Sequence, residues 1–408
     1  MTTGRDLSVE AATVFRTAGT APGAATVERL TAGPVDWPRL LWLAEHELAT
    51  ASLWRALAHD APAPVPPAVA EYLARSTTMS DFRMQHLSGR LQESVRALGA
   101  HHVRVLLLKG AAVGALSDAT FRSRPMNDLD LLVRPDDVPR ARAALLSAGW
   151  TASTDPTVDV LLADHHHLPP FLDPRMPGIR LELHVSTLPP EHPFALPESE
   201  VWAQAREAPA PFAGALLPSA EHLLLHTCVH FAWSHAMSFG AWRTIRSVAV
   251  LVGSGAVDWE AFVALARASR GATACYWTLR LSSALGGIEL PASVLPRLAA
   301  PSPEFVRRAL ERHFITTLVP GEGPPSPSVR LSRLLWVTAL RPRWSGHRTP
   351  GRLDTEQRWG RAMGTFVAES PWARSVRHLR GIVPWWRFLV GTLLRSVARW
   401  PRGRPTPR

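Results

Sequence analysis

The sequence contains almost no lysine and almost no asparagine. Lysine and arginine together account for 45 of the 408 residues, yet Lys109 is the only lysine, and Asn127 is the only asparagine. Lysine is normally among the commonest residues. A nucleotide bias toward Arg, Ala, Pro and Gly codons explains the scarcity, and under that bias a surviving Lys or Asn marks a position where the substitute fails. Both survivors lie in one short stretch, which is therefore the first place to look for function.

The chain is also poor in cysteine and in long apolar runs. Cys228 and Cys275 are the only cysteines, which excludes a disulfide framework. No apolar run reaches the roughly 18 residues of a membrane-spanning helix, and no basic segment followed by an apolar run marks a secretory signal. We therefore expect a cytoplasmic protein. Hydrophobic residues make up 46%, enough for a packed core, which argues against disorder, collagen and coiled coil.

The net charge of +11 comes mainly from the end of the chain. Residues 371–408 hold nine arginines and no acid, so the rest of the chain carries 36 basic against 34 acidic side chains. The same segment contains Trp385, Trp386 and Phe388. Arginine mixed with aromatic residues suits a membrane surface or a nucleic acid, and it also suits a terminal helix that packs on the body. All three interpretations of this tail remain open.

Hydrophobic spacing divides the chain into helical and mixed regions. Residues 1–35 show no clear period and are expected to be a loose lead-in, whereas the spacing after Asp36 predicts one helix up to the proline-rich break at 61–67. Short apolar runs at 103–110, 128–133 and 179–186 predict strands that alternate with helices. The helices predicted elsewhere cover about 68–98, 134–150, 219–234, 240–252, 258–269, 272–285 and 303–317. We therefore expect a helical region at 1–100, an α+β core at 101–205, a helical acceptor-side domain at 206–320, and a linker with the basic tail at 321–408.

Two of the predicted strands carry carboxylates on one face. Alternate residues of a strand share a face, so Asp128 and Asp130 project side by side while Leu129 points into the core. Like charges held this close are costly without a cation, and Mg²⁺ prefers oxygen ligands together with substrate phosphates. Glu182, on the polar face of the strand at 179–186, is the best candidate for a third carboxylate. A solvated strand edge would explain the DxD motif alone, but not the three acids together.

The lone lysine ends the strand at 103–110, where the chain turns into a helix. Free backbone N–H groups at such a turn favour a phosphate, Gly110 lets a ligand approach the backbone, and Lys109 adds a compact charge. No Walker A pattern is present. Arg122 and Arg124, just before the acids, are placed to contact a triphosphate; solvation of a loop is an equal alternative for Arg122 and a weaker one for Arg124. We assign Lys109, Gly110, Arg124 and Asn127 to nucleotide and phosphate binding.

These motifs resemble a known family. The segments LLLKGAAVGALSDATFRSRPMNDLDLLVRPDD and HHHLPPFLDPRMPGIRLELHVS are similar to nucleotidyltransferases of the DNA polymerase β superfamily, and above all to a bacterial family of uncharacterised nucleotidyltransferases with the signature KG…R…DxDLLV…ExH. The resemblance covers roughly residues 36–270. It implies a polymerase β-like α+β core, a small mixed sheet with helices, flanked by helical N- and C-terminal regions. The usual Gly-Ser turn of the superfamily is Lys-Gly here, so nucleotide handling is expected to differ.

The resemblance also implies a reaction. Asp128, Asp130 and Glu182 would hold two Mg²⁺ ions, or Mn²⁺ in their place, and Glu182 would help to polarise the attacking hydroxyl. The substrate would be an NTP, and a nucleoside monophosphate would pass to a hydroxyl or phosphate of an acceptor with release of pyrophosphate. A small molecule, a peptide and an RNA end all remain open as the acceptor.

The many histidines are candidates for the acceptor pocket. The run Asp164-His165-His166-His167 has neither a cysteine partner nor the HExxH spacing, so a zinc site is not favoured. We assign His166, His167, His184 and His230 to the acceptor side. For His226 and His230, four residues apart on one helix, hydrogen bonding within the core is the simpler interpretation.

Two other functions compete with the transferase. A toxin-like enzyme that modifies tRNA would use the basic tail for RNA, and salt-dependent RNA binding would support it. A non-catalytic accessory protein of a biosynthetic cluster could keep the fold, but a binding role does not need three clustered acids.

Overall fold

The computed structural model describes residues 7–19, 34–60, 65–152, 166–189, 192–319 and 329–340, together with the isolated positions 386, 390 and 394. The predicted tail at 371–408 and the residues Asp164 and His165 therefore lie outside the described residues, apart from those three positions. The described part is a mixed α+β structure with one seven-stranded mixed sheet, and no helix in it is long and apolar enough to span a membrane.

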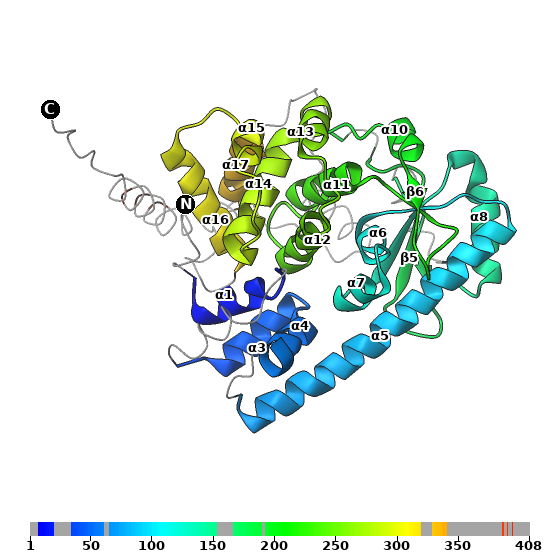
Figure 1. The fold of residues 1–408 in the computed structure, drawn as a ribbon, viewed down its shortest axis with the longest axis horizontal. Helices are drawn as coiled ribbons and strands as arrows, with labels where there is room; N and C mark the ends of the chain where they lie inside the picture. The colour runs from blue at the N-terminus through cyan, green and yellow to red at the C-terminus, as the bar shows by residue number, and fades with distance from the viewer. Residues whose placement is uncertain are drawn as a thin grey trace, which may run out of the picture.

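The sheet forms the right-hand part of Figure 1 and joins strands from a long stretch of sequence. Its strands are short, and their order is β3-β4-β5-β2-β1-β7-β6. They span β1 (Leu106–Leu107), β2 (Asp128–Leu132), β3 (Thr151–Ala152), β4 (Phe171–Leu172), β5 (Arg180–His184), β6 (Arg206–Glu207) and β7 (Leu216–Leu217). The central pair, β2 and β5, is parallel, and β1 runs antiparallel to β2. The two longest strands therefore lie side by side at the centre.

Helices cover the sheet and extend away from it. Between strands lie α6 (Lys109–Gly114), α7 (Asp118–Ser123), the 3₁₀ turn η3 (Pro135–Asp137), α8 (Val138–Ser147) and α10 (Glu198–Ala203). The 34-residue α5 (Pro67–Ala100) is about 50 Å long and runs along one edge of the molecule to α7 and α8 (Figure 1). Its buried residues lie mostly in the C-terminal half, against the sheet region.

The remaining helices pack on one another beside the sheet. The N-terminal ones are α1 (Val9–Arg16), α3 (Trp37–His46), α4 (Thr50–Arg55) and the π-helical turn η2 (Ala56–Asp60). After the sheet come α11 (Ala220–Trp233), α12 (Ala241–Gly253), α13 (Trp259–Ala268), α14 (Ala272–Leu281), the π-helical turn η4 (Ser282–Gly286), α15 (Val294–Leu298), α16 (Glu304–Leu318) and α17 (Val329–Leu340). One continuous apolar core runs from α1 to α17, and both α11 and α12 contact α6. The helical regions and the sheet are thus joined through α6.

Side chains at the helix ends explain several boundaries. Ser219 accepts a hydrogen bond from the backbone N–H of His222, and Asp258 accepts from Glu260 and Ala261, so each caps its helix. Nearly all positions of α11 are buried. An apolar helix of this kind has to lie inside the molecule, between neighbours on several sides.

Three expectations about the fold need correction. The helix predicted from Asp36 onward is interrupted after His46, where Leu48 takes a left-handed φ of 60°. The supposed lead-in contains α1, capped by Ser8 and with Phe15 buried; its many Ala and Thr residues obscured the helical period. The sheet continues past residue 205 to Leu217. The sequence did not predict its last two strands, because strands of two residues are too short to show a hydrophobic period.

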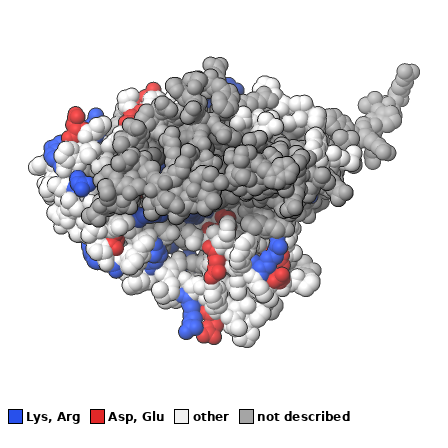
Figure 2. Space-filling model, turned by 180° about the vertical axis from the view of Figure 1, so that it is seen from behind, with Lys and Arg blue, Asp and Glu red and all other residues white. Residues whose placement is uncertain are grey.

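The visible surface shows no segregation of charge among the described side chains. On the face drawn in Figure 2, acidic and basic groups lie next to one another in small clusters. Exposed ion pairs of this type, such as Arg75 with Glu71 at 3.5 Å, contribute little to stability. The described surface in this view therefore gives no electrostatic reason to expect a nucleic acid there.

Candidate active site

The three predicted carboxylates meet at the centre of the sheet. Asp130 on β2 is the register partner of Glu182 on β5, and Asp128 lies on the same face of β2 as Asp130. Leu129 and Leu183 on the opposite faces are completely buried. The apolar residues thus fix the two strands in the core, and the alternation directs all three acids to the other side.

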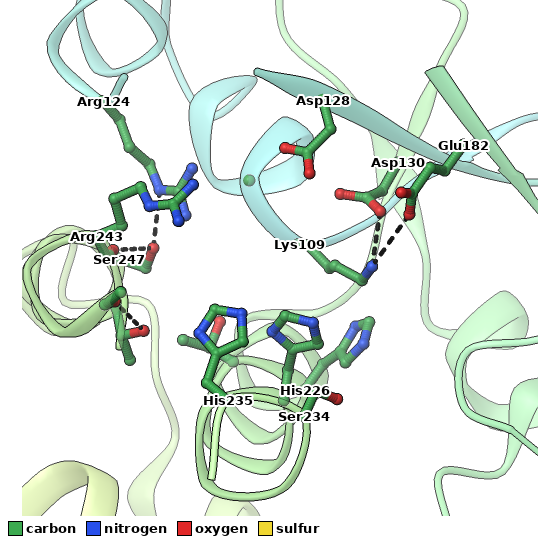
Figure 3. A pocket seen from close by; sticks show the side chains of 15 residues that line it. Lys109, Arg124, Asp128, Asp130, Glu182, His226, Ser234, His235, Arg243 and Ser247 are labelled. Atoms are coloured by element: carbon green, nitrogen blue, oxygen red, sulfur yellow. Dashed lines mark hydrogen bonds and ion pairs between the residues drawn. The ribbon is translucent and has the colours of Figure 1, made fainter. Parts of the chain in front are cut away.

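Lys109 lies inside the acidic cluster. Its Nζ is 2.7 Å from Oδ1 of Asp130 and 3.7 Å from Oε2 of Glu182 (Figure 3). The backbone N–H of Leu108 donates to the carbonyl of Asp130 at 2.9 Å, which fixes the start of α6 against β2. Lys109 itself has a left-handed φ of 44°. The lone lysine is therefore held by carboxylates, rather than free to bind a phosphate.

A cluster of three histidines that do not line the cavity lies beside the carboxylates. Nε2 of the fully buried His184 lies 2.9 Å from Oδ1 of Asp130 and 3.6 Å from Oε2 of Glu182. Nε2 of His167 is 3.8 Å from the same glutamate oxygen, and the rings of His166 and His167 both pack against His184. These contacts orient the acids, in the way that second-layer groups orient metal ligands.

Burial and charge shift the pKa values of this cluster in different directions. Burial and the neighbouring charges of Asp130 and Glu182 raise the pKa of Asp128. Burial also acts to raise the pKa of Asp130, but the Lys109 charge and the hydrogen bond to His184 outweigh it and hold that pKa well below its usual value. Burial alone would lower the pKa of Lys109, yet the carboxylates raise it, so the lysine stays charged.

Two arginines form the opposite side of the site. Arg124 follows α7, and its Nε donates to Oγ of Ser247 on α12 at 2.9 Å, while Arg243 lies one turn before that serine (Figure 3). Among the residues that the structure describes, neither guanidinium is paired with a carboxylate. Burial and the charge of Arg243 lower the pKa of Arg124 to about 10, which is the expected effect of two like charges placed together.

The approach of Arg124 depends on a glycine. A Cβ on Gly110 would lie 2.5 Å from an Nη atom of Arg124. The missing side chain thus leaves the space that the guanidinium fills over the start of α6. Gly110 was predicted to give a phosphate room to approach the backbone; the structure shows an arginine there.

A cavity of about 320 Å³ joins the carboxylates and the arginines. Its lining comes from α6, β2, β5 and the residue after α7, and from α11, α12 and the turn between these two helices. The lining residues are Lys109, Gly110, Arg124, Asp128, Asp130, Glu182, His226, Thr227, His230, Ser234, His235, Gly240, Arg243, Thr244 and Ser247. Burial lowers the pKa of His226 to about 3 and that of His230 well below its usual value, so both imidazoles are neutral near pH 7. The part of the wall formed by α11 therefore offers uncharged imidazoles to the cavity.

The structure brings most of the predicted residues together, but not all. Lys109, Gly110, Arg124, the three acids and His230 line the cavity. Asn127 does not, because its Oδ1 accepts a hydrogen bond from Nε of Arg83 on α5 at 3.2 Å. His166, His167 and His184, predicted for the acceptor pocket, lie behind the carboxylates instead, as described above.

Several cavity residues were not singled out from the sequence. Gly240 and Thr244, and likewise Arg243 and Ser247, are four residues apart and therefore share one side of α12; this polar side was the available signal. His226, for which the sequence favours hydrogen bonding within the core, also lines the cavity, and so does His235.

The acids provide the ligands that a hard divalent cation prefers. Ligand atoms of Asp130, Glu182 and His184 all lie within 4.8 Å of one another. Asp128 is not part of this close group, but it lies on the same face of β2 and lines the same cavity. In the described part of the chain, Asp128 has no hydrogen-bond or ion-pair partner, although it faces the cavity. The donor set, rich in oxygen and free of thiolates, fits Mg²⁺ or Mn²⁺.

Comparison with known proteins agrees with this chemistry. Residues 33–287 match the model of a family described as uncharacterised nucleotidyltransferases. No curated protein and no solved structure matches the chain. The family match spans α3 to η4, so it includes every residue of the cavity. Since it covers more than half of the sequence, the chain belongs to this nucleotidyltransferase family and is a transferase.

Proposed function

We propose that the protein is a Mg²⁺-dependent nucleotidyltransferase that moves a nucleoside monophosphate from an NTP to a hydroxyl or phosphate of an acceptor, with release of pyrophosphate. One observation carries the proposal: three convergent carboxylates and two arginines without carboxylate partners among the described residues line the same cavity. A nucleotide bound to a divalent cation needs both kinds of group.

The carboxylates form the metal side of the site. Asp128, Asp130 and Glu182 would hold the ion, which when bound neutralises phosphate charge and favours displacement at phosphorus. His184 keeps the Asp130 carboxylate in place through its 2.9 Å contact. Glu182, at the edge of the cluster beside the cavity, is placed to orient an attacking hydroxyl.

The arginines form the phosphate side of the site. Arg124 and Arg243 present two guanidinium groups to the cavity, and guanidinium groups bind phosphate oxygens in pairs. Ser247 fixes Arg124 by accepting from its Nε, which leaves the outer nitrogens for the ligand. The sequence suggested that Lys109 contacts the triphosphate, but its ammonium contacts the carboxylates. We therefore assign the triphosphate contact to Arg124 and Arg243.

The acceptor side is assigned to α11 and the turn after it. His230, with His226 and Ser234, lines the wall opposite the acids. Neutral imidazoles there would accept a hydrogen bond from a hydroxyl without repelling the metal. The nature of the acceptor and a role of residues 371–408 at a membrane or on RNA remain predictions from the sequence.

Label transfer tests the reaction class. The protein is incubated with Mg²⁺, a cell extract and NTPs labelled at either the α- or the γ-phosphate. A nucleotidyltransferase yields an acceptor labelled from the α-phosphate only, whereas a kinase labels it from the γ-phosphate. The variant Asp128→Asn with Asp130→Asn should transfer no label. Asp118→Asn, which removes an acid of an exposed ion pair with Arg122, is the matched control and should keep full activity. Equal transfer by the double variant would remove the assignment.

A further inference from the structure

The position of Lys109 conflicts with the simplest model of the site. A lysine at a phosphate-binding turn would be expected to face the substrate. Its ammonium instead lies between the carboxylates of Asp130 and Glu182, with Nζ at 2.7 Å and 3.7 Å from their oxygens. A cation that bridged these two strands would need the same oxygens.

The backbone is arranged so that the lysine reaches this place. Lys109 has a φ of 44°, a conformation that is strained for a residue with a side chain and that glycine adopts freely. Gly110, which could adopt this conformation without strain, comes one position later, and its φ is not left-handed. Strain that persists beside a functional site points to a role for the residue that bears it. The strained position here directs a cation into the acidic cluster.

Lys109 contacts the carboxylates of Asp130 and Glu182, but not that of Asp128. Oδ1 of Asp130 receives both the ammonium and Nε2 of His184, at 2.7 Å and 2.9 Å. Asp128, in contrast, has no partner within the described ranges and lines the cavity. Three carboxylates and one ammonium leave a charge of −2, which one divalent cation neutralises. The cluster therefore has the ligands and the charge for one ion beside the lysine.

We propose that Lys109 is a built-in cation of the active site: its ammonium takes the place of one of two divalent ions, so that the protein itself binds a single ion, with Asp128 as the open ligand. The inference rests on the proposed nucleotidyltransferase function for the purpose of the site, but on the lysine contacts for the number of ions. It replaces the expectation of two metal ions from the sequence.

The test counts Mn²⁺ bound to the full-length protein, without nucleotide, by the electron paramagnetic resonance signal of the free ion. The wild type should bind one Mn²⁺ in the site. Lys109→Gln, which removes the charge at similar length, should either bind a second Mn²⁺ or bind the first about tenfold more tightly. Lys109→Arg keeps the charge and should keep a single ion. Arg122→Gln removes an exposed cation that is paired with Asp118 outside the cavity, so it should leave Mn²⁺ number and affinity unchanged.

Specific outcomes overturn the inference. Two bound ions, or no saturable Mn²⁺ binding, in the wild type would contradict it. Both results come from the wild type and therefore do not depend on whether a variant folds. Identical Mn²⁺ number and affinity in the wild type and Lys109→Gln would contradict it as well. Two ions in a protein that transfers α-label would leave the proposed function intact and remove only the role of Lys109. A single ion and the expected Lys109→Gln effect, without any label transfer, would support the role of Lys109 and contradict the proposed function.

Discussion

At the scale of single residues, the positively charged side chains of the site differ in whether they are paired with a carboxylate. Lys109 is held by carboxylates, whereas Arg124 and Arg243 have no carboxylate partner in the part of the chain that the structure describes. A charge without a partner at a cavity wall is costly unless a ligand compensates it. The two arginines therefore identify the part of the cavity where an anion belongs.

Removal of Arg243 should weaken nucleotide binding. A charge-assisted hydrogen bond to a phosphate contributes about 1.5–3 kcal/mol, so Arg243→Gln should raise the Kd for NTP by roughly 10- to 100-fold. The affinity for the nucleoside without phosphates should stay the same. Calorimetric titration measures both, with Arg122→Gln as control, since Arg122 is exposed and paired with Asp118. Equal losses in the two variants would mean that only net charge matters.

Gly110 should not tolerate a methyl group. In Gly110→Ala the new Cβ would overlap the Arg124 guanidinium at 2.5 Å and displace it from the cavity wall. We expect NTP affinity to fall about tenfold with little loss of stability, because the displaced group is the end of a long side chain. Gly99→Ala is the matched control, since nothing lies within 4 Å of its added Cβ. Unchanged NTP affinity in Gly110→Ala would contradict the assignment of Arg124.

At the scale of elements, N-terminal residues hold α12 against the site. Oε2 of the buried Glu47 accepts from the backbone N–H of Trp242 at 2.9 Å, and the indole Nε1 of Trp242 donates to Oγ1 of Thr17. Arg246 donates to the carbonyl of Gly19 and to Oγ of Ser123. Residues far apart in sequence thus fix the helix that carries Arg243.

Loss of the Glu47 contact should destabilise the protein. Glu47→Ala leaves the N–H of Trp242 unsatisfied in the core and should lower the free energy of unfolding by about 1–3 kcal/mol. Glu47→Gln keeps an acceptor oxygen and should lose much less. Urea denaturation compares the three proteins, and equal stabilities would show that Glu47 does not hold α12.

The sequence predicted the strands of the site better than its far wall. The alternation in β2 and β5 was strong enough to place Asp128, Asp130 and Glu182 on one face, because apolar and polar residues alternate from Asp128 to Leu131 and throughout β5. The direction of Lys109 was not predictable, since it depends on a single backbone torsion. Arg243 was missed because it is remote from Arg124 and the acids in sequence, and only tertiary packing brings them to one cavity.

At the scale of the whole molecule, buried neutral histidines couple stability to pH. Burial lowers the pKa of His313 to about 4 and that of His192 to about 4, below the value near 6.5 of an unfolded chain. Between pH 6.5 and about 4 the unfolded state therefore binds protons that the folded state does not. Stability should be complete above pH 6.5 and fall as the pH is lowered through this range.

The histidine effect can be isolated far from the cavity. His313 on α16 should account for about 1 kcal/mol of the stability lost between pH 7.5 and 5.5, and His313→Gln should reduce the loss by that amount. His101→Gln changes an exposed histidine at the end of α5 and is the control. Urea denaturation at the two pH values gives the difference. A loss in His313→Gln as large as in the wild type would contradict the prediction.

The most direct test of the whole account is a crystal structure of the protein with Mn²⁺ and a non-hydrolysable NTP analogue, with the ion located by its anomalous scattering. The account predicts an anomalous peak beside Asp128, Asp130 and Glu182, and a triphosphate that contacts Arg124 and Arg243 in the same cavity. A nucleotide bound elsewhere, or a peak away from the three carboxylates, would contradict it.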